Sequence, residues 1–315
     1  MSNWISPLSD PDLNSLSVTE IVRRIAAGET TAVAVTEACL ARIEARESDL
    51  RAWAFVDHGL ALQQARARDR DTPYGLLHGV PLGVKDIIDT HDMPTEMGSP
   101  IYAGHRPVAD AACVALVRGA GATILGKTVT TEFAGSHPGP TTNPFDPTRT
   151  AGGSSSGSAA AVGGAMMPAA IGTQVGGSII RPAAFCGNFA LKPSQGAIHR
   201  GERQATSMST HGPHAACIED MWQVAIEIAS RTGGDPGQSG LMGPLTTPHP
   251  IRPERLIVLE MEGWPKLDSD TISAFEQLID GLQKAGVTVL RRKDHTWIES
   301  LETSIANATA VCRMI

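Results

Sequence analysis

Apolar residues alternate with other residues in a short stretch just before Lys85. Val80, Leu82 and Val84 occupy every second position there, which is the period of a β-strand, and the strand is expected to end near the lysine. Four more short apolar runs predict strands, at residues 52–57, 122–128, 255–260 and 287–292.

Helical patterns fill the intervals between these strands. Ser17 and Glu20 form a capping-box pattern, which predicts an amphipathic helix from there to about Gly28. The alternation of strand, helix and strand predicts an α/β fold with a parallel sheet and right-handed crossovers. Further helices are expected over residues 31–47, over 110–119 with Asp110 as the cap, over 269–285, and around Leu301 and Ile305.

Composition narrows the classes of protein that fit this pattern. The chain has 315 residues, of which 42% are apolar and 19% charged, the balance of a globular protein. Its net charge of −7 argues against nucleic acid as a partner. No signal-peptide pattern or bilayer-length apolar run is present, so we expect a cytoplasmic protein without a membrane partner. Five scattered cysteines without a CxxC pair predict buried thiols rather than disulfides or a zinc site.

Two glycine-rich turns, at residues 152–157 and 172–178, carry the candidate chemistry. Successive glycines let backbone N–H groups converge, and a following helix adds positive potential, so such a turn can hold a developing oxyanion. The GxxxxGK[ST] pattern of a phosphate loop is absent. We therefore expect Ser178 to be a nucleophile at an oxyanion hole. Lys85 is the candidate base, because burial disfavours the charged form of a lysine.

Three motifs together resemble those of the amidase signature family: GVKD at 83–86, GGSSSGSAAAV at 152–162 and GTQVGGSIIRPAAFCG at 172–187. The resemblance spans roughly residues 17–220 and implies a proton relay. In it Ser178 attacks an amide carbonyl, Ser154, held across a cis peptide bond, passes the proton on, and Lys85 accepts it. The implied enzyme is a serine amidohydrolase that converts a small-molecule carboxamide into a carboxylate and ammonia or an amine through an acyl-enzyme. It needs no metal and no organic cofactor.

The same resemblance assigns the surroundings of the relay and the fold. It implies one amidase signature domain over residues 1–315, built on a single large, mixed, mainly parallel twisted sheet with helices on both faces. The catalytic core is expected at about 70–220 and a C-terminal βαβ segment at 255–292. A homodimer is compatible with the family. The expected oxyanion-hole donors are the backbone N–H groups of Val175, Gly176, Gly177 and Ser178, and the expected supporting residues are Gly152, Gly153, Ser155, Gln174 and Arg181.

The chain departs from the family's pattern in three ways. The usual text is GTDxGGSIRxPA, whereas this chain has Gln174 for the aspartate and Ile180 for the arginine, with Arg181 one position later. Charged side chains at those places would brace the turn by strong hydrogen bonds, and Gln174 can still bond through its amide. Segment 196–216 differs from the amidotransferase A-subunit branch, which favours a free-standing amidase. Family members are also longer, so we expect the chain to lack their C-terminal part.

Other interpretations remain open at this point. Residues 153–157 also match the GxSxG nucleophile elbow of α/β-hydrolases, although the preceding segment is polar rather than strand-like. The chain could instead be a non-catalytic or truncated assembly subunit, or a glutaminase-type amidotransferase subunit. Of the other polar candidates, Lys127 and Lys192 are expected to be structural or solvated lysines, and Asp86 and Glu132 are expected to orient neighbouring groups rather than act on substrate. The histidines are expected to be surface or loop residues: His137, His211 and His214.

Overall fold

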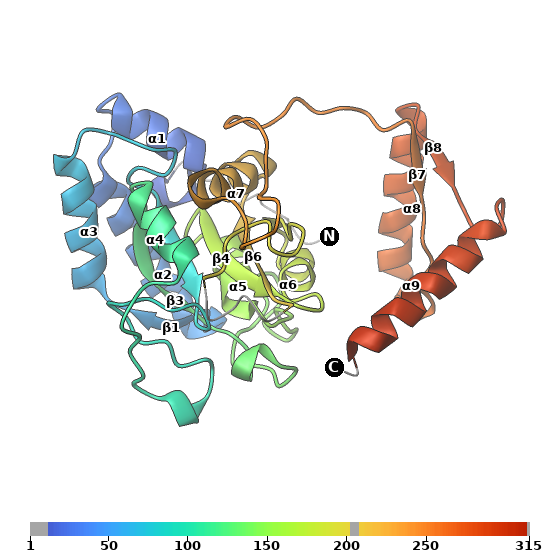
Figure 1. The fold of residues 1–315 in the computed structure, drawn as a ribbon, viewed down its shortest axis with the longest axis horizontal. Coiled ribbons are helices and arrows are strands. Elements are labelled where there is room, and N and C mark those ends of the chain that lie inside the picture. Colours follow the sequence, from blue (N-terminus) through green and yellow to red (C-terminus); the bar gives the residue numbers. More distant parts are fainter. Residues whose placement is uncertain (1–11, 202–207, 314–315) are drawn as a thin grey trace. The chain divides into compact units, whose positions relative to one another are not determined.

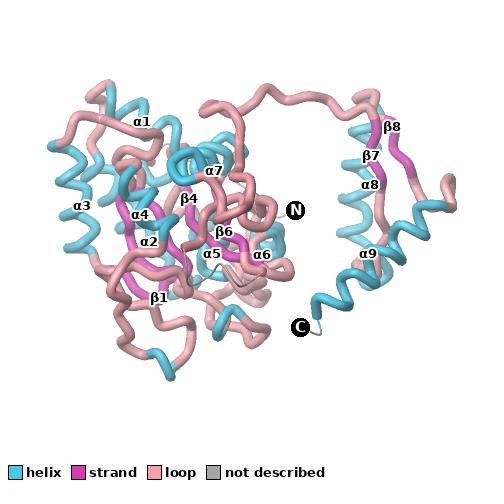
Figure 2. Tube along the Cα trace, in the orientation of Figure 1, coloured by secondary structure: helices cyan, strands magenta, loops and turns pink. Residues whose placement is uncertain are grey.

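The computed structural model describes residues 12–201 and 208–313, which fall into two compact units. The first unit is Met1–Thr247 and the second is Pro248–Ile315. Figure 1 shows the elements along the chain, and Figure 2 shows which segments are helix, strand and loop. The boundary between the units falls within a Gly/Pro-rich loop. That both units belong to one amidase domain stays a prediction.

A mixed sheet of six strands organises the described part of the first unit, in the order β1-β3-β2-β4-β6-β5. Strand β2 pairs in parallel with both β3 and β4, whereas β1 is antiparallel to β3, and β6 is antiparallel to both β4 and β5. Four of the six strands therefore point the same way, which confirms the predicted mixed, mainly parallel sheet. The strands are β1 (Trp53–Val56), β2 (Pro81–Lys85), β3 (Thr123–Thr128), β4 (Ala169–Gln174), β5 (Phe189–Ala190) and β6 (Thr210–Ala215).

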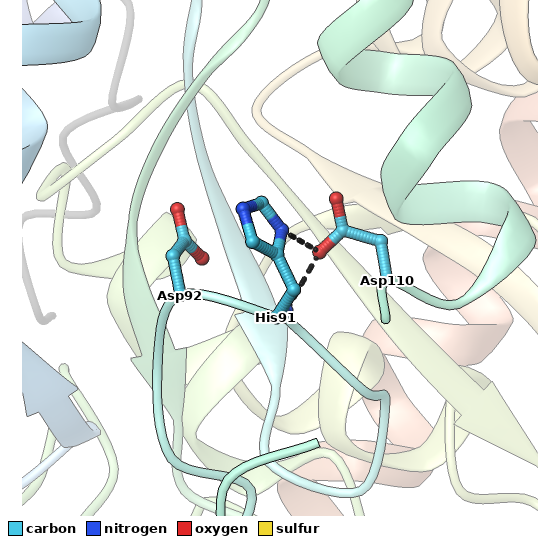
Figure 3. A group of neighbouring side chains, drawn as sticks. All are labelled: His91, Asp92 and Asp110. Carbon is cyan, nitrogen blue, oxygen red and sulfur yellow. Dashed lines mark hydrogen bonds and ion pairs between the residues drawn. The ribbon is translucent and has the colours of Figure 1, made fainter. Parts of the chain in front are cut away.

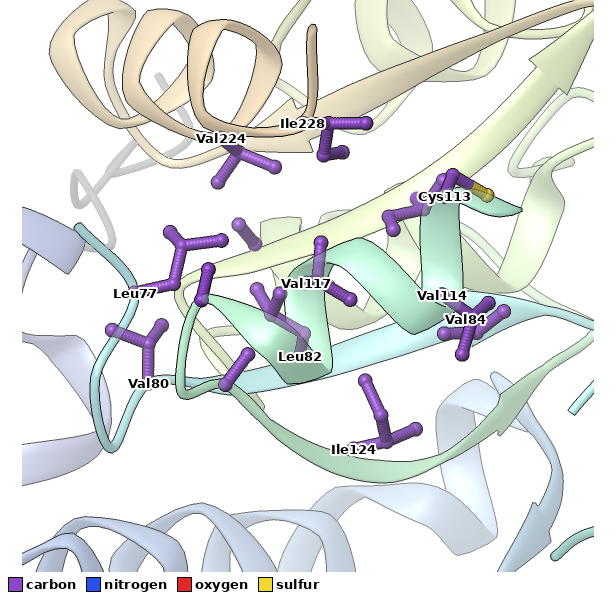
Figure 4. Close-up of a cluster of buried hydrophobic side chains, with 14 of the residues drawn as sticks. Leu77, Val80, Leu82, Val84, Cys113, Val114, Val117, Ile124, Val224 and Ile228 are labelled. Carbon is purple, nitrogen blue, oxygen red and sulfur yellow. The ribbon is translucent and has the colours of Figure 1, made fainter. Parts of the chain in front are cut away.

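Helices cover both faces of this sheet, as predicted. One buried apolar cluster joins α1, α4 and α7 to the sheet, and a second joins α2 and α5 to it. In Figure 4, Val114 and Val117 of α4 lie among strand residues such as Leu82, with Val224 and Ile228 of α7 close by. The helices are α1 (Val18–Ala26), α2 (Ala32–Leu50), α3 (His58–Arg70), α4 (Ala112–Gly119), α5 (Ser156–Gly163), α6 (Ile180–Phe185) and α7 (Ile218–Thr232).

The alternation along β2 decides where the candidate base points. Leu82 and Val84 belong to the cluster under α4 and α7. Gly83 and Lys85 therefore face the opposite side, since successive side chains of a strand point to opposite faces. At Gly83 an added Cβ would lie 2.6 Å from the Met167 side chain, which belongs to the cluster under α2 and α5. The lysine thus projects toward the face that α5 covers.

Most of the predicted elements are present, with small differences at their ends. The Ser17 side chain accepts a hydrogen bond from the Glu20 N–H at 3.1 Å, which confirms the predicted cap of α1. The predicted cap of α4 is wrong: Ala111 occupies that position, and no side chain caps the helix. Asp110 instead forms an ion pair with Arg118 at 3.1 Å, which removes its carboxylate from the helix end.

The cysteines follow the prediction of unpaired thiols where they are described. Cys39, Cys113 and Cys186 are buried and free, and Cys217 is free and half-buried. The side chain of Cys312 lies outside the described residues. Within the described ranges, no helix combines the length and apolar character needed to cross a bilayer.

The second unit is a small α/β arrangement with its own buried residues. Its elements are β7 (Arg255–Ile257), α8 (Ser269–Lys284), β8 (Thr288–Leu290) and α9 (Trp297–Arg313). Strands β7 and β8 pair with each other in parallel, and α8 connects them along the chain, which confirms the predicted βαβ segment. Val258, Ile279, Val287 and Ile298 are each at most 5% exposed.

Candidate active site

Lys85 lies at the end of β2 with no exposed surface, and its amine contacts two polar residues. Its Nζ is 2.6 Å from Ser154 Oγ, and it donates to Thr173 Oγ1 at 2.8 Å and to the Thr173 carbonyl at 3.4 Å. Burial lowers the pKa of Lys85 well below its usual value. None of the ion pairs formed by the described residues includes Lys85, so no carboxylate opposes this shift.

The loop that carries Ser154 is held in one shape by its neighbours. The Gly153–Ser154 peptide bond is cis, and Gly152 has φ +78°, a left-handed conformation that favours glycine. The Ser154 carbonyl accepts from the Thr131 N–H at 3.1 Å, and the Ser155 N–H donates to the Ser178 carbonyl at 3.2 Å. The last bond ties the two glycine-rich turns together, although they are far apart in sequence.

Ser154 and Ser178 line one cavity of about 240 Å³. Ser154 is buried and Ser178 is half-buried. The sequence predicted both residues, but it offered no reason to choose Thr173, which lines the same cavity and holds Lys85 through two oxygens. The signal that could have found it is its place on β4, whose pairing with β2 brings this threonine beside the lysine.

The turn after β4 is braced by two of the predicted supporting residues. Gln174 Oε1 accepts from the N–H of Ile179 at 2.7 Å and of Ile180 at 3.0 Å. Arg181 donates to the Gly176 carbonyl at 2.9 Å. The Gln174 side chain thus still bonds to the turn through its amide, as predicted, and Arg181 bonds to it from one position after Ile180.

The N–H groups of this turn are not used elsewhere. In the hydrogen bonds of the described loops and turns, none of the N–H groups of residues 175–178 acts as a donor. Gly177 has φ +115°, a conformation that L side chains rarely adopt. These N–H groups are therefore available for an acceptor that enters from outside the chain.

A second buried lysine, Lys127, has different surroundings. Lys127 on β3 pairs with Val84 on β2, so its side chain points to the same side of the sheet as Val84 and to the side opposite to Lys85. Its Nζ is 3.3 Å from Asp86 Oδ1 and donates to Thr95 Oγ1 at 2.5 Å. Burial lowers the pKa of Lys127, but the Asp86 carboxylate opposes that shift. Lys127 is thus a structural lysine in an ion pair.

Two further residues expected to be structural or solvated have local partners. Glu132 accepts a hydrogen bond from Ser99 Oγ at 2.8 Å, which fits an orienting role. Lys192 is exposed and donates to the Pro193 carbonyl at 2.7 Å, which fits a solvated lysine.

The expectation of surface or loop positions holds for only one of the three histidines. His137 is exposed, but His211 and His214 are buried on β6, because this strand pairs with β4 and β5 on its two sides. Burial lowers the pKa of His211 to about 4 and of His214 to about 3, and the Arg200 charge adds to the shift of His211. Both imidazoles are therefore neutral at pH 7.

Among the described residues outside this site, one group of side chains has metal-ligating chemistry: His91, Asp92 and Asp110. Figure 3 shows His91 between the two carboxylates, bonded to Asp110. Arg118 pairs with Asp92 at 2.6 Å and with Asp110 at 3.1 Å. Both carboxylates therefore already share the positive charge of Arg118, and the cluster is an ion-pair network that joins α4 to the loop after β2.

Comparison with known proteins agrees with the site's motifs. The Amidase family model matches residues 34–310. The chain belongs to the amidase signature family. It is 42% identical over 249 residues to the glutamyl-tRNA(Gln) amidotransferase A-subunit of Chloroflexus aurantiacus, a match that covers 75% of this chain and 50% of that protein. It is 39% identical over 246 residues to a putative amidase AmiD of Mycobacterium bovis, covering 75% of this chain and 52% of the relative.

Solved amidase structures share the fold. The peptide amidase of Stenotrophomonas maltophilia superimposes with a TM-score of 0.72 at 31% identity, over 91% of this chain and 63% of the other. The chain spans about half the length of the curated amidase relatives that it matches. The hydrolase-elbow interpretation loses its basis, because the described residues directly before Ser154 form turns and one isolated bridge rather than a strand.

Proposed function

We propose that this chain is the catalytic part of a serine amidohydrolase, with Ser178 as nucleophile, Ser154 as proton relay and Lys85 as base. The observation that carries the proposal is the 2.6 Å contact between Lys85 Nζ and Ser154 Oγ in a fully buried place. The shared cavity of Ser154 and Ser178 adds to it, since a relay needs both hydroxyls near one substrate.

The protonation state of Lys85 supports its role as a base. A neutral amine has two N–H bonds and one lone pair. The hydroxyl and carbonyl of Thr173 accept the two N–H bonds, which leaves the lone pair for the Ser154 hydroxyl proton. The absence of a paired carboxylate among the described residues favours this neutral form, in contrast to Lys127.

The reaction then proceeds in two acyl-transfer steps. Ser178 Oγ attacks the amide carbonyl carbon while its proton passes to Ser154 Oγ, whose own proton passes to Lys85 Nζ. The C–N bond breaks as the proton returns through Ser154 to the leaving nitrogen, and an ester on Ser178 remains. Water then attacks this ester by the same relay and releases the carboxylic acid and free Ser178.

The turn of residues 175–178 supplies the expected oxyanion hole. Its N–H groups are available to the negatively charged oxygen of the tetrahedral intermediate. Removing one such donor costs on the order of 100-fold to 1000-fold in kcat in serine hydrolases. Gln174 and Arg181 support this arrangement from outside the cavity.

A glutaminase-type amidotransferase subunit is the second candidate, because relatives with that name are 42% identical to this chain. The two candidates differ in what they need. A free-standing amidase releases ammonia from a simple amide without a partner, whereas the subunit releases it from glutamine within an assembly. Ammonia release from acetamide and from glutamine by the purified chain separates them.

The test of the catalytic assignment uses a fluorophosphonate probe, which labels activated serines. Labelling is expected at Ser178, and both labelling and amide hydrolysis are expected to be lost in Ser178→Ala and Lys85→Met. The controls are Ser136→Ala and Lys192→Met, which change an exposed serine and an exposed lysine outside the cavity. Well-folded protein that takes up no probe would instead support a non-catalytic assembly subunit.

A further inference from the structure

Three aromatic rings lead away from the cavity that holds the two serines. Phe133 lines this cavity, and its side chain is 45% exposed. Its ring meets Tyr102 edge to face, with centroids 6.0 Å apart and planes at 78°. Tyr102 meets His105 in the same way, at 5.6 Å and 88°. We call Phe133, Tyr102 and His105 the aromatic row.

The backbone holds the start of this row in an unusual conformation. Phe133, Ala134 and Met97 all have positive φ, at 50°, 56° and 57°, although none is a glycine. Such conformations cost on the order of 1 kcal/mol or more each and cluster at functional sites. The Phe133 N–H donates to the Met97 carbonyl at 2.8 Å, which fixes one left-handed residue against another.

The row is also tied to the loop of Ser154. The Ala134 N–H donates to the Thr131 carbonyl at 2.9 Å, and the Thr131 N–H donates to the Ser154 carbonyl at 3.1 Å. The ring of Phe133 is therefore positioned relative to the proposed relay, and it faces the cavity rather than the core. A ring needed only for packing would gain more by being buried.

The chemistry of the cavity indicates what lies against this ring. Its described lining has no ionisable side chain: Ile87, Phe133, Ala134, Ser154, Thr173, Val175, Ser178 and Ser209. The charged ends of an amino acid such as glutamine would find no partner in this lining. An uncharged amide with a flat apolar group fits both the lining and the exposed ring, because aromatic pairs gain from edge and face contacts.

We propose that the aromatic row binds an aryl group of the substrate, so that the preferred substrate is an uncharged aryl-bearing carboxamide. This inference rests on the proposed amidase function. Phe133 acts as a specificity-determining residue next to the scissile amide. Tyr102 and His105 extend the surface for larger aryl groups.

The test compares phenylacetamide with acetamide, measured as ammonia release by the full chain. The wild type is expected to prefer phenylacetamide, and Phe133→Ala to lower the ratio of the two kcat/KM values about tenfold through KM. Phe133→Leu is expected to retain part of the preference. Phe145→Ala is the matched control, since Phe145 is 43% exposed and outside the cavity lining. Tyr102→Ala is expected to lower kcat/KM for a biphenyl amide more than for phenylacetamide.

A binding measurement separates this inference from the proposed function. The Ser178→Ala variant is titrated with phenylacetamide and acetamide, with and without Phe133→Ala. Tighter binding of phenylacetamide that depends on Phe133 supports the row even if the wild type hydrolyses nothing, in which case only the amidase proposal fails. If Phe133→Ala weakens binding of both amides equally, or if the wild type does not prefer phenylacetamide over acetamide, the aryl site is overturned. Amide hydrolysis by the wild type would in that case still support the proposed amidase function.

Discussion

Replacing Thr173 by valine removes one oxygen from the surroundings of Lys85 and keeps the branched shape of the side chain. The lost contact is the 2.8 Å hydrogen bond from Lys85 Nζ, and the carbonyl that remains is 3.4 Å away. A hydrogen bond of this kind contributes about 0.5–1.5 kcal/mol. The lysine becomes less well oriented toward Ser154 by that amount, so we expect kcat to fall about 2-fold to 12-fold.

The Thr173→Val substitution should also shift the pH dependence of activity in a defined direction. An acceptor stabilises the protonated amine more than the neutral one, so its loss lowers the pKa of Lys85 further. Activity requires the neutral amine, and it is lost as the pH falls through this pKa. The acid limb of the kcat/KM profile should therefore move to lower pH in Thr173→Val.

The assay is ammonia release over a range of pH, with thermal unfolding followed by circular dichroism to show that the variant is folded. Thr173→Ser is the matched control because it keeps the hydroxyl and loses only a methyl group. It should retain the position of the acid limb. A valine variant with the wild-type rate and the wild-type acid limb would refute the role of Thr173 and weaken that of Lys85.

Three other predictions test the supports of the site. Gln174→Leu removes the acceptor of two backbone N–H groups and should lower kcat about tenfold, whereas Gln174→Glu should retain most of it; equal rates would remove the bracing role. Burial lowers the pKa of His214 to about 3, so this residue should lower stability by about 1.4 kcal/mol per pH unit as the pH drops below about 6.5. In denaturant titrations His214→Gln should reduce the slope by about that amount while the contribution of His211 remains, and the exposed His249→Gln should leave the slope unchanged; identical slopes in both variants contradict the assignment. Asp86→Asn and Lys127→Met should each cost about 3–5 kcal/mol, and the double variant less than their sum; additive costs would mean that the ion pair is not coupled.

The described fold follows from local patterns wherever those patterns are complete. The caps and apolar faces of α1 and α8 are explicit in the sequence, and both helices form within a few residues of the prediction. Strand β6 was not predicted, because Thr210–Ala215 has no alternation of apolar and polar residues. It is buried throughout and contains Gly212, where a Cβ would lie 1.9 Å from the Leu191 carbonyl. Only the neighbouring strands explain this glycine.

Some residues of the candidate site are likewise predicted by local sequence, whereas others are brought to it only by the fold. Lys85, Ser154 and Ser178 lie in motifs with their own spacing, so the sequence could select them before any fold was known. Thr173 carries no signal of its own, since a threonine before a glycine turn is common in strands. Its role exists only because β4 lies beside β2. The buried positions of His211 and His214 depend on the pairing of β6 with β4 and β5, which the local sequence does not indicate.

Lys85, the last residue of β2, and Asp86, which directly follows it, have partners on opposite sides of the sheet. Lys85 turns to one side of the sheet and meets a serine, and Asp86 meets a lysine on the other. Since a shift of one position reverses every side chain of a strand, a single-residue deletion between Pro81 and Val84 would bring the acid to the serine and leave two amines without their partners. Such a deletion would abolish the proposed proton relay and leave two buried lysines without their partners. The length of this short strand is therefore as constrained as its composition.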